Sequence, residues 1–277
     1  MDNMNTNAVP VVMSFAENDP SGGSGIQADI EALASMGCHC APIITALTIQ
    51  DSVGIKESSA CSTSLLISQA RVVLEDLPIS VIKLGMFGNV ENIEAIHSIL
   101  QDYPEIPVVL DPVLSSIYEP QAYDPEIIDA IVSLILPNTT ICIPSTDEAQ
   151  ALAPEADNLE SSIQEIMTLG VSYVLLTGIS NQAKTVINRL FSNHRELETF
   201  EWQRLNSQYH GAGYTLSASI SGLLAQNLDP MSAVYEAQEY TWGTLQQGYR
   251  IGMGKQLPNR FFWARESGVN DEKGQEQ

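Results

Sequence analysis

Tyr209-His210-Gly211-Ala212-Gly213-Tyr214-Thr215-Leu216-Ser217 is a glycine turn that leads into an apolar helical pattern. One face of that helix would hold Leu216, Ile220, Leu223 and Leu224, which recur at helical spacing. A Gly-x-Gly turn at a helix start leaves backbone N–H groups pointing outward, and the helix dipole adds positive potential there. The stretch therefore predicts an anion site at Gly211, Ala212 and Gly213, with the side chain of Tyr214 facing the bound anion.

A second glycine-rich turn lies near the N-terminus, in the run Asp19-Pro20-Ser21-Gly22-Gly23-Ser24-Gly25-Ile26-Gln27-Ala28-Asp29. Three glycines within four residues indicate that a backbone comes close to a ligand. Turns of this kind also occur for packing alone, so the run by itself leaves both interpretations open.

The rest of the chain alternates short apolar runs with helical patterns, which is typical of βαβ units and a mainly parallel sheet. We expect a single α/β domain over residues 1–277, with flexible termini at about 1–8 and 267–277. The expected strands are 9–15, 41–49, 81–84, 108–110, 140–143 and 173–176, followed by an antiparallel pair at 185–191 and 198–204. The expected helices are 25–36, 64–74, 91–100, 125–136, 147–152, 159–169, 215–225 and 231–246.

Charge narrows the class of partner. Acidic residues outnumber basic ones 34 to 12, for a net charge of −22, which argues against nucleic acid and anionic membrane surfaces. No apolar run is long enough to span a membrane, and no signal peptide is recognisable. The four cysteines lack zinc-site spacing and are expected to be mostly buried free thiols, so we expect a cytoplasmic protein.

Polar motifs follow several of the expected strands. They are Asn18-Asp19, Gln50-Asp51, Gly85-Met86, Asp111-Pro112-Val113 and Thr177-Gly178. Ligands of parallel α/β sheets bind beyond the carboxyl ends of the strands. The shared placement predicts one ligand site at that edge of the sheet.

Taken together, these segments resemble the hydroxymethylpyrimidine/phosphomethylpyrimidine kinases of thiamine biosynthesis. The resemblance rests on DPSGGSGIQADIEAL, ITALTIQDS, IKLGMFG, VVLDPV, DEAQAL and YHGAGYTLSASISGLLAQ, which occur in the family's order over most of the chain. It implies a ribokinase-like three-layer α/β/α sandwich with a mainly parallel central sheet, ATP and Mg²⁺ as cosubstrate and metal, and a homodimer. The implied reaction is phosphorylation of 4-amino-5-hydroxymethyl-2-methylpyrimidine, or of its monophosphate.

The resemblance also implies roles for single residues. The pyrimidine pocket would be formed by Ser24, Thr48, Gln50, Met86 and Val113, with Asp29 as a further substrate residue. The nucleotide side would hold Asp111, Ser145, Thr177 and Gly178, and Glu148 would position Mg²⁺ through water. The anion hole would be the amides of Gly211, Ala212, Gly213 and Tyr214. Ordinary alternatives are a solvated helix acid for Asp29, a cap for Asp111 and a helix-start acid for Glu148.

Several positions depart from the family's pattern on the phosphate side. Tyr214 stands where the family has a cysteine, and relatives in the fold an aspartate, proposed as the base for the substrate hydroxyl. A phenol with a pKa of about 10 is a poor base at neutral pH. Glu17 replaces a glycine, where it would repel phosphate unless it points away. Ser145 replaces an asparagine, Thr177 a lysine, and residues 114–119 lack the family's glycine.

These departures leave three interpretations. The first is an adapted kinase, since phosphoryl transfer depends mainly on positioning and charge stabilisation. The second is a pseudokinase that binds a pyrimidine or nucleotide and acts through a partner. The third is a kinase of another alcohol, such as a pyridoxal-like or sugar-like one.

Overall fold

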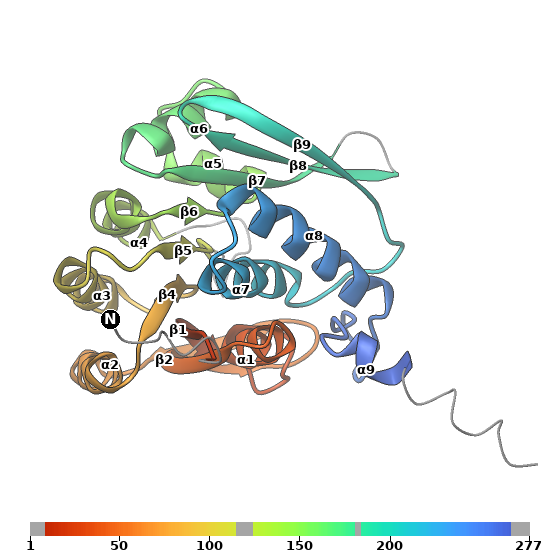
Figure 1. The fold of residues 1–277 in the computed structure, drawn as a ribbon, viewed down its shortest axis with the longest axis horizontal. Helices are drawn as coiled ribbons and strands as arrows, with labels where there is room; N and C mark the ends of the chain where they lie inside the picture. The colour runs from red at the N-terminus through yellow and green to blue at the C-terminus, as the bar shows by residue number, and fades with distance from the viewer. Residues whose placement is uncertain (1–8, 115–123, 181–183, 267–277) are drawn as a thin grey trace, which may run out of the picture.

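The central feature of the computed structural model is a nine-stranded sheet, in the order β3-β2-β1-β4-β5-β6-β7-β8-β9 (Figure 1). The structure describes residues 9–114, 124–180 and 184–266; the expected flexible termini lie outside them. The strands are β1 (Val11–Asn18), β2 (His39–Gln50), β3 (Ile55–Ala60), β4 (Ile79–Leu84), β5 (Val108–Leu110), β6 (Ile141–Cys142), β7 (Tyr173–Ser180), β8 (Thr185–Ser192) and β9 (Arg195–Gln203). The six strands β1, β2, β4, β5, β6 and β7 pair in parallel, and β3, β8 and β9 are antiparallel.

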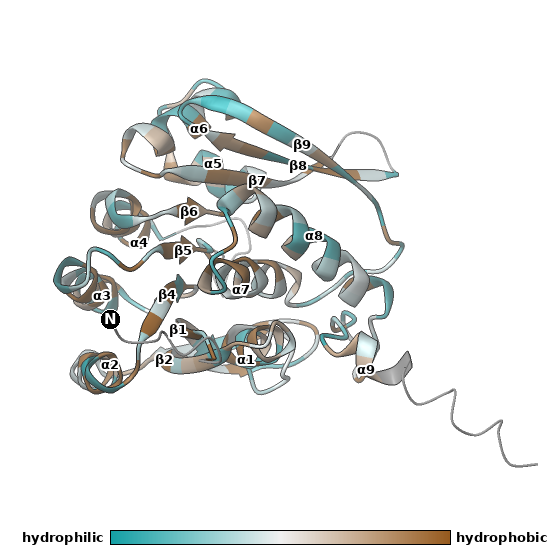
Figure 2. Cartoon of the chain, in the orientation of Figure 1, coloured by the Kyte–Doolittle hydropathy of each residue, from teal (hydrophilic) through white to brown (hydrophobic). Residues whose placement is uncertain are grey.

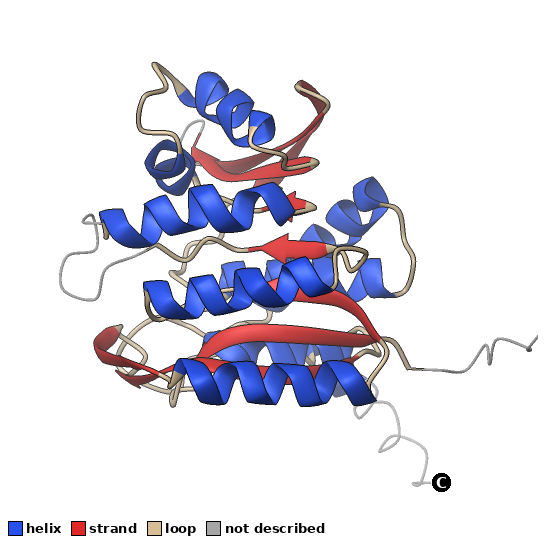
Figure 3. Ribbon diagram, turned by 90° about the vertical axis from the view of Figure 1, so that its left-hand side faces the viewer, coloured by secondary structure: helices blue, strands red, loops and turns tan. Residues whose placement is uncertain are grey.

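Helices cover both faces of the sheet, which gives the expected three layers. One layer holds α2 (Thr63–Asp76), α3 (Val90–Asp102), α4 (Pro125–Ala130), α5 (Thr146–Leu152) and α6 (Leu159–Thr168), and its helices run side by side in Figure 3. The other holds α1 (Gly25–Ser35), α7 (Ala212–Ala225) and α8 (Pro230–Gln246). A short helix, α9 (Phe262–Glu266), follows.

Strand alternation explains the two cores. In β1, Met13 and Phe15 join the core under α2 and α3, whereas Val12 joins the core under α1 and α7. Figure 2 shows apolar residues concentrated on the inner strands, while β9 is largely hydrophilic. Parallel strands covered on both faces need this continuous apolar sequence, and an edge strand such as β9 does not.

The chain crosses from β1 to β2 on one side and returns to β4 on the other. The carboxyl ends of β1 and β4 therefore border a topological switch point, where ligands of such sheets bind. Glu17 and Asn18 end β1 at this point, and Gly85 follows β4.

Four details differ from the sequence prediction. Strand β3 was not expected, because its sequence IKESSA lacks an apolar pattern and only one side of it pairs, with β2. Strand β7 continues to Ser180, so Thr177 and Gly178 lie at an irregularity within the strand rather than after it. The expected helix 125–136 is α4 followed by a π turn (Ile131–Ile135) and a 3-10 turn (Leu136–Asn138). Helix α9 was also not expected.

Among the described residues, no helix combines the length and apolarity that a membrane crossing requires. All four cysteines are free thiols, as expected. Cys38 and Cys142 are buried, but Cys40 and Cys61 are only partly so.

A buried ion pair joins β4 to α1. The Lys83 ammonium lies 2.9 Å from both carboxylate oxygens of Asp29, and both side chains are fully buried. Asp29 also accepts a hydrogen bond of 2.6 Å from the Ser14 hydroxyl of β1. Each charge is thus compensated only while its partner is present.

We expect Lys83→Met to lower the free energy of unfolding by about 3–5 kcal/mol, because it leaves the Asp29 carboxylate buried without a cation. The matched control is Arg71→Met, which breaks an exposed pair with Asp102 and should cost at most about 1 kcal/mol. Urea unfolding of the three proteins at neutral pH measures both. Equal losses in the two variants would show that burial of the Lys83 pair carries no special cost.

Candidate active site

The two glycine turns predicted from the sequence lie against each other. Gly211 is the N-cap of α7 and has a left-handed backbone with φ of +89°. A Cβ atom at Gly211 would overlap the carbonyl oxygen of Gly23 in the other turn. Only glycine permits this approach, which sets the first N–H groups of α7 beside the 19–25 turn.

Arg260 forms hydrogen bonds to both the 19–25 turn and the start of α7. Its guanidinium donates to the Gly23 carbonyl at 2.6 Å and to the Thr215 hydroxyl of α7 at 2.9 Å. A third bond reaches the Glu31 carboxylate of α1 at 3.0 Å. Arg260 is buried, so these bonds form in a low-dielectric setting where charge-assisted hydrogen bonds are strong.

Asp19 shapes the first turn. Its carboxylate accepts from the backbone N–H groups of Ser21 and Ser24, both at 2.8 Å, and from the Ser24 hydroxyl at 2.9 Å. His210 Nε2 lies 2.9 Å from the same carboxylate. Burial alone would raise the pKa of Asp19, but the hydrogen bonds from His210, Ser21 and Ser24 outweigh it and hold the pKa well below its usual range.

The residues expected to bind the pyrimidine gather next to this turn. Gln50 Nε2 lies 3.4 Å from the Ser24 hydroxyl and 2.7 Å from His210 Nε2, and Gln50 Oε1 accepts from the Thr48 hydroxyl at 3.1 Å. Val113 packs against the cluster that contains Tyr214. Met86 is buried after β4, where its carbonyl accepts from the Thr45 hydroxyl. The structure thus brings four predicted pocket residues (Ser24, Thr48, Gln50 and Val113) near the two turns.

Asp29 is placed differently from the other predicted substrate residues. It is fully buried, and its carboxylate bonds to Lys83 and Ser14. It is therefore not the solvated helix acid of the ordinary interpretation. These contacts give it a structural role in the core, and they do not support direct contact with a substrate.

Tyr214 points into the protein towards the end of β1. Its hydroxyl donates a hydrogen bond of 2.6 Å to Glu17 Oε1, and the Lys83 ammonium lies 4.6 Å from its ring centre. Burial and the neighbouring Glu17 carboxylate raise the pKa of Tyr214 well above its usual range, so the phenol stays protonated. Glu17 therefore points to a hydrogen-bond donor of α7.

Burial raises the pKa of Glu17 to about 7, although the Tyr214 hydroxyl and the charge of Lys83 both lower it. Its second oxygen, Oε2, is buried and has no hydrogen-bond partner among the described residues. A buried carboxylate oxygen without a partner costs free energy and is uncommon in folded proteins.

Two further carboxylates of the predicted site lie after β5 and at the start of α5. Asp111, after β5, accepts from the Ser217 hydroxyl of α7 at 3.0 Å, and a side chain on Gly213 would lie 3.7 Å from its carboxylate. Glu148 forms a capping box with Ser145 at the start of α5, with bonds of 2.8 Å and 2.7 Å to the Ser145 backbone N–H and hydroxyl. Burial, and after it the charge of Asp111, raise the pKa of Glu148 to about 7.

The sequence and fold were compared with those of known proteins. Residues 19–259 match the family model described as phosphomethylpyrimidine kinase. The chain belongs to this family. A hydroxymethylpyrimidine/phosphomethylpyrimidine kinase of Staphylococcus aureus is 26% identical over 269 residues, covering 95% of this chain and 97% of the relative. One from Mycobacterium tuberculosis is 27% identical over 251 residues, covering 88% and 91%.

Solved structures agree on the fold. The Bacillus subtilis pyridoxal kinase in its ADP complex superposes with a TM-score of 0.84 at 23% identity, covering 91% of this chain and 98% of that one. Phosphomethylpyrimidine kinase from Clostridium difficile gives a TM-score of 0.69 at 26% identity, covering 83% and 98%. This family member therefore has the ribokinase-like α/β fold and belongs to a group of phosphotransferases.

A cavity of about 210 Å³ is linked to Gly178, one of the predicted nucleotide residues, and its lining residues do not include Asp111, Ser145, Thr177 or Gly178. The Gly178 backbone N–H donates to Asn188 Oδ1 of β8 at 3.0 Å, and Asn188 lines the cavity. Leu216 of α7 also lines it, together with Trp202, Gln238, Thr241 and Trp242. Thr177 bonds to the Pro144 carbonyl, directly before Ser145.

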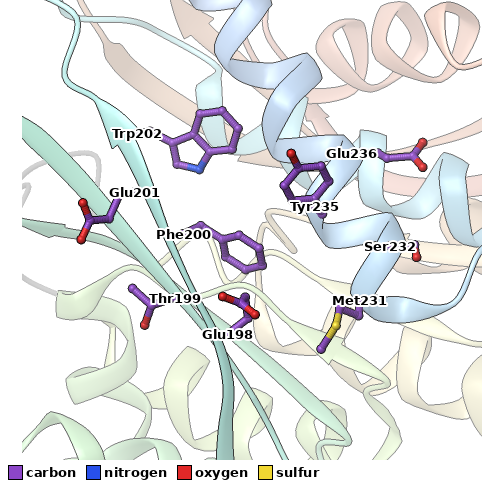
Figure 4. Close-up of a pocket in the computed structure, with 9 residues that line it drawn as sticks. All are labelled: Glu198, Thr199, Phe200, Glu201, Trp202, Met231, Ser232, Tyr235 and Glu236. Atoms are coloured by element: carbon purple, nitrogen blue, oxygen red, sulfur yellow. The ribbon is translucent and has the colours of Figure 1, made fainter.

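A separate groove of about 660 Å³ lies between β9 and α8 (Figure 4). Phe200 and Tyr235 face each other across it, with ring centres 6.3 Å apart. Three of its nine lining residues are glutamates, namely Glu198, Glu201 and Glu236. Their charge disfavours a phosphate ligand, and none of the predicted site residues lines this groove.

Two parts of the site were not expected from the sequence. Glu17 was expected to repel phosphate unless it points away, and its bond to Tyr214 was not expected, because 197 residues separate the two positions. Arg260 was not expected to take part, because no motif surrounds it. The only available signal was a lone arginine after Pro258-Asn259 in a chain with few basic residues.

We expect Gly211→Ala to lower the free energy of unfolding by at least about 2 kcal/mol, because it combines a left-handed backbone with overlap on the Gly23 carbonyl. The control is Gly213→Ala, whose new methyl group meets only ordinary contact at 3.7 Å and should cost about 1 kcal/mol or less. Thermal unfolding of both variants measures the difference. Similar losses would contradict the close approach of the two turns.

Glu17 also predicts how stability depends on pH. Its pKa is raised from 4.5 to about 7 on folding, so the stability that its protonated form provides is lost as pH rises from about 4.5 through 7. We expect Glu17→Gln to be more stable than wild type at pH 8 by about 3 kcal/mol and to show little difference at pH 4.5. The control, Glu198→Gln on exposed β9, should show no such trend. Denaturant unfolding across this pH range checks it, and parallel curves for wild type and Glu17→Gln would refute the raised pKa.

Proposed function

We propose that this protein phosphorylates 4-amino-5-hydroxymethyl-2-methylpyrimidine, its monophosphate, or both, using ATP and Mg²⁺, in the supply of thiamine diphosphate. Support comes from the family match over residues 19–259 and from relatives named for this activity. We further expect a homodimer, which size-exclusion chromatography with light scattering would detect.

One observation carries the proposal: the start of α7 is pressed against the 19–25 turn through Gly211 and Gly23. Free N–H groups of Gly211, Ala212, Gly213 and Tyr214 would stabilise the phosphoryl group as it moves between donor and acceptor. The adjacent turn carries Ser24, which is linked to Gln50. Acceptor and phosphate would thus meet where the two turns touch.

Asp111 and Glu148 offer carboxylates to a magnesium ion. Asp111 is buried and Glu148 is partly buried, and the negative charge of Asp111 contributes to the raised pKa of Glu148. A divalent cation near both would relieve that repulsion. Carboxylate and water ligands suit Mg²⁺. When bound, the ion would neutralise charge on the ATP phosphates, and Glu148 would hold it through water.

The 210 Å³ cavity fits the base of the nucleotide. It is lined by the aromatic side chains of Trp202 and Trp242 and by the amides of Asn188 and Gln238, groups that can pack against a purine and bond to its edge. Asn188 also contacts the Gly178 backbone N–H, which ties the cavity to the nucleotide residues predicted from the sequence.

The pyrimidine would lie next to the 19–25 turn, on the side away from the 210 Å³ cavity. Gln50 can both donate and accept hydrogen bonds along the aminopyrimidine edge once it exchanges its contact with His210. Val113 and Met86 would pack against the ring.

The test is phosphoryl transfer from ATP to the hydroxymethylpyrimidine, its monophosphate and pyridoxal, measured in parallel with and without Mg²⁺. We expect Mg²⁺-dependent product with at least one pyrimidine and a kcat/KM at least about 10-fold above that for pyridoxal, since matched polar contacts in a pocket discriminate by more than about 1.4 kcal/mol. Product from pyridoxal alone would assign another substrate, and no product from any of the three would overturn the kinase proposal.

A further inference from the structure

Glu17 is a buried carboxylate between the two halves of the site. It lies next to the end of β1, at the switch point of the sheet. On one side its Oε1 accepts from Tyr214 of the phosphate-side helix α7. On the other, its carboxyl carbon would lie 3.2 Å from a side chain on Gly25, directly after Ser24 of the substrate-side turn. Among the described residues, no other carboxylate lies between these two turns with one of its oxygens unpaired.

The second carboxylate oxygen of Glu17 is the part of this side chain that can bind a ligand. Glu17 Oε2 is buried and accepts no hydrogen bond from the part of the chain that the structure describes, whereas Oε1 accepts one of 2.6 Å from the phenol. Orphaned buried carboxylate oxygens are costly, so a ligand that supplies an O–H at this place would gain the full benefit of pairing it. A primary alcohol is such a ligand.

Tyr214 cannot itself take a proton from an alcohol. Its pKa is raised by burial and by Glu17, and it already donates its own proton to that carboxylate. Its bond instead fixes the orientation of Glu17, in the way a second group orients a catalytic base.

We propose that Glu17 is the proton acceptor for the substrate hydroxyl and that Tyr214 is its positioning residue. This inference rests on the proposed kinase function and names the group that performs one of its steps. The alcohol oxygen forms a bond to the γ-phosphorus of ATP while its proton moves to Glu17 Oε2. The bond from that phosphorus to the β,γ-bridging oxygen breaks, ADP leaves with the electron pair, and Glu17 later returns the proton to solvent.

The charges around Glu17 set the expected pH dependence. The titratable groups that face it are Tyr214 from α7, Lys83 from β4 and Asp29 from α1, and Lys83 and Asp29 largely compensate each other. Burial raises the pKa of Glu17 to about 7, close to the pH at which a general base is most effective. Because the base must be deprotonated, kcat should rise with pH through about 7 and then level off.

The experiment compares pH profiles of kcat for wild type, Glu17→Gln and Tyr214→Phe with the hydroxymethylpyrimidine and ATP. Glu17→Gln keeps the shape and can still accept from Tyr214, so we expect it to fold, bind ATP and lose about 10²–10⁴-fold in kcat together with the titration near pH 7. Tyr214→Phe removes the hydroxyl that lowers the pKa of Glu17, so its titration should remain and move to higher pH.

Tyr240→Phe is the matched control, because it also removes a phenol hydrogen bond, here from a partly buried tyrosine to the Arg260 carbonyl at 2.7 Å. It should leave the position of the titration unchanged. A Glu17→Gln protein that binds ATP and retains wild-type kcat overturns the inference, and so does a Tyr214→Phe profile that coincides with wild type. If the wild-type protein phosphorylates neither pyrimidine, the proposed function is overturned, and this inference with it. If the wild-type protein is active and the variants are unaffected, the inference alone is overturned.

Discussion

The contact between Gly211 and Gly23 is the constraint on which the site depends. It requires a left-handed residue without a side chain at the N-cap of α7 and a carbonyl of the 19–25 turn against it. Arg260 holds the two turns from beneath, and Asp19 holds the first turn in shape with four hydrogen bonds. These contacts set the N–H groups of α7 beside the turn that carries Ser24. Asp111 lies at the same helix start, where it accepts a hydrogen bond from Ser217.

A second set of interactions close to that contact is electrostatic. Lys83 and Asp29 form a fully buried pair, and the ring of Tyr214 covers the ammonium. This arrangement explains how the protein tolerates Glu17 in the same region. The Glu17 carboxylate accepts a hydrogen bond from the Tyr214 phenol and lies near Lys83, whose charge is paired with Asp29. Burial nevertheless raises the pKa of Glu17. Glu17 and Tyr214 are thus coupled, because the phenol of Tyr214 donates to one oxygen of the Glu17 carboxylate.

Much of this could be predicted from the sequence. The parallel strands have buried apolar runs and each glycine turn precedes a helix, so the three-layer fold with its mainly parallel sheet was predicted correctly. The anion site at the start of α7 stays a prediction. Strand β3 was missed because IKESSA carries no apolar signal, and Thr177 was placed after a strand that continues to Ser180. The Glu17–Tyr214 bond and the Arg260 clamp were missed because they join residues far apart in the chain, and composition and periodicity report only on neighbours.

The proposed reaction is transfer of a phosphoryl group, held where the two turns touch, to an alcohol whose proton Glu17 accepts. Phosphorus NMR of ATP, Mg²⁺ and the hydroxymethylpyrimidine at pH 8 tests it, with wild type and with Glu17→Gln, each shown to bind ATP. We expect a phosphomonoester signal to grow as ADP forms with wild type, and at least about 100-fold more slowly with the variant. ADP formation without a phosphomonoester, or equal rates in the two proteins, would contradict it.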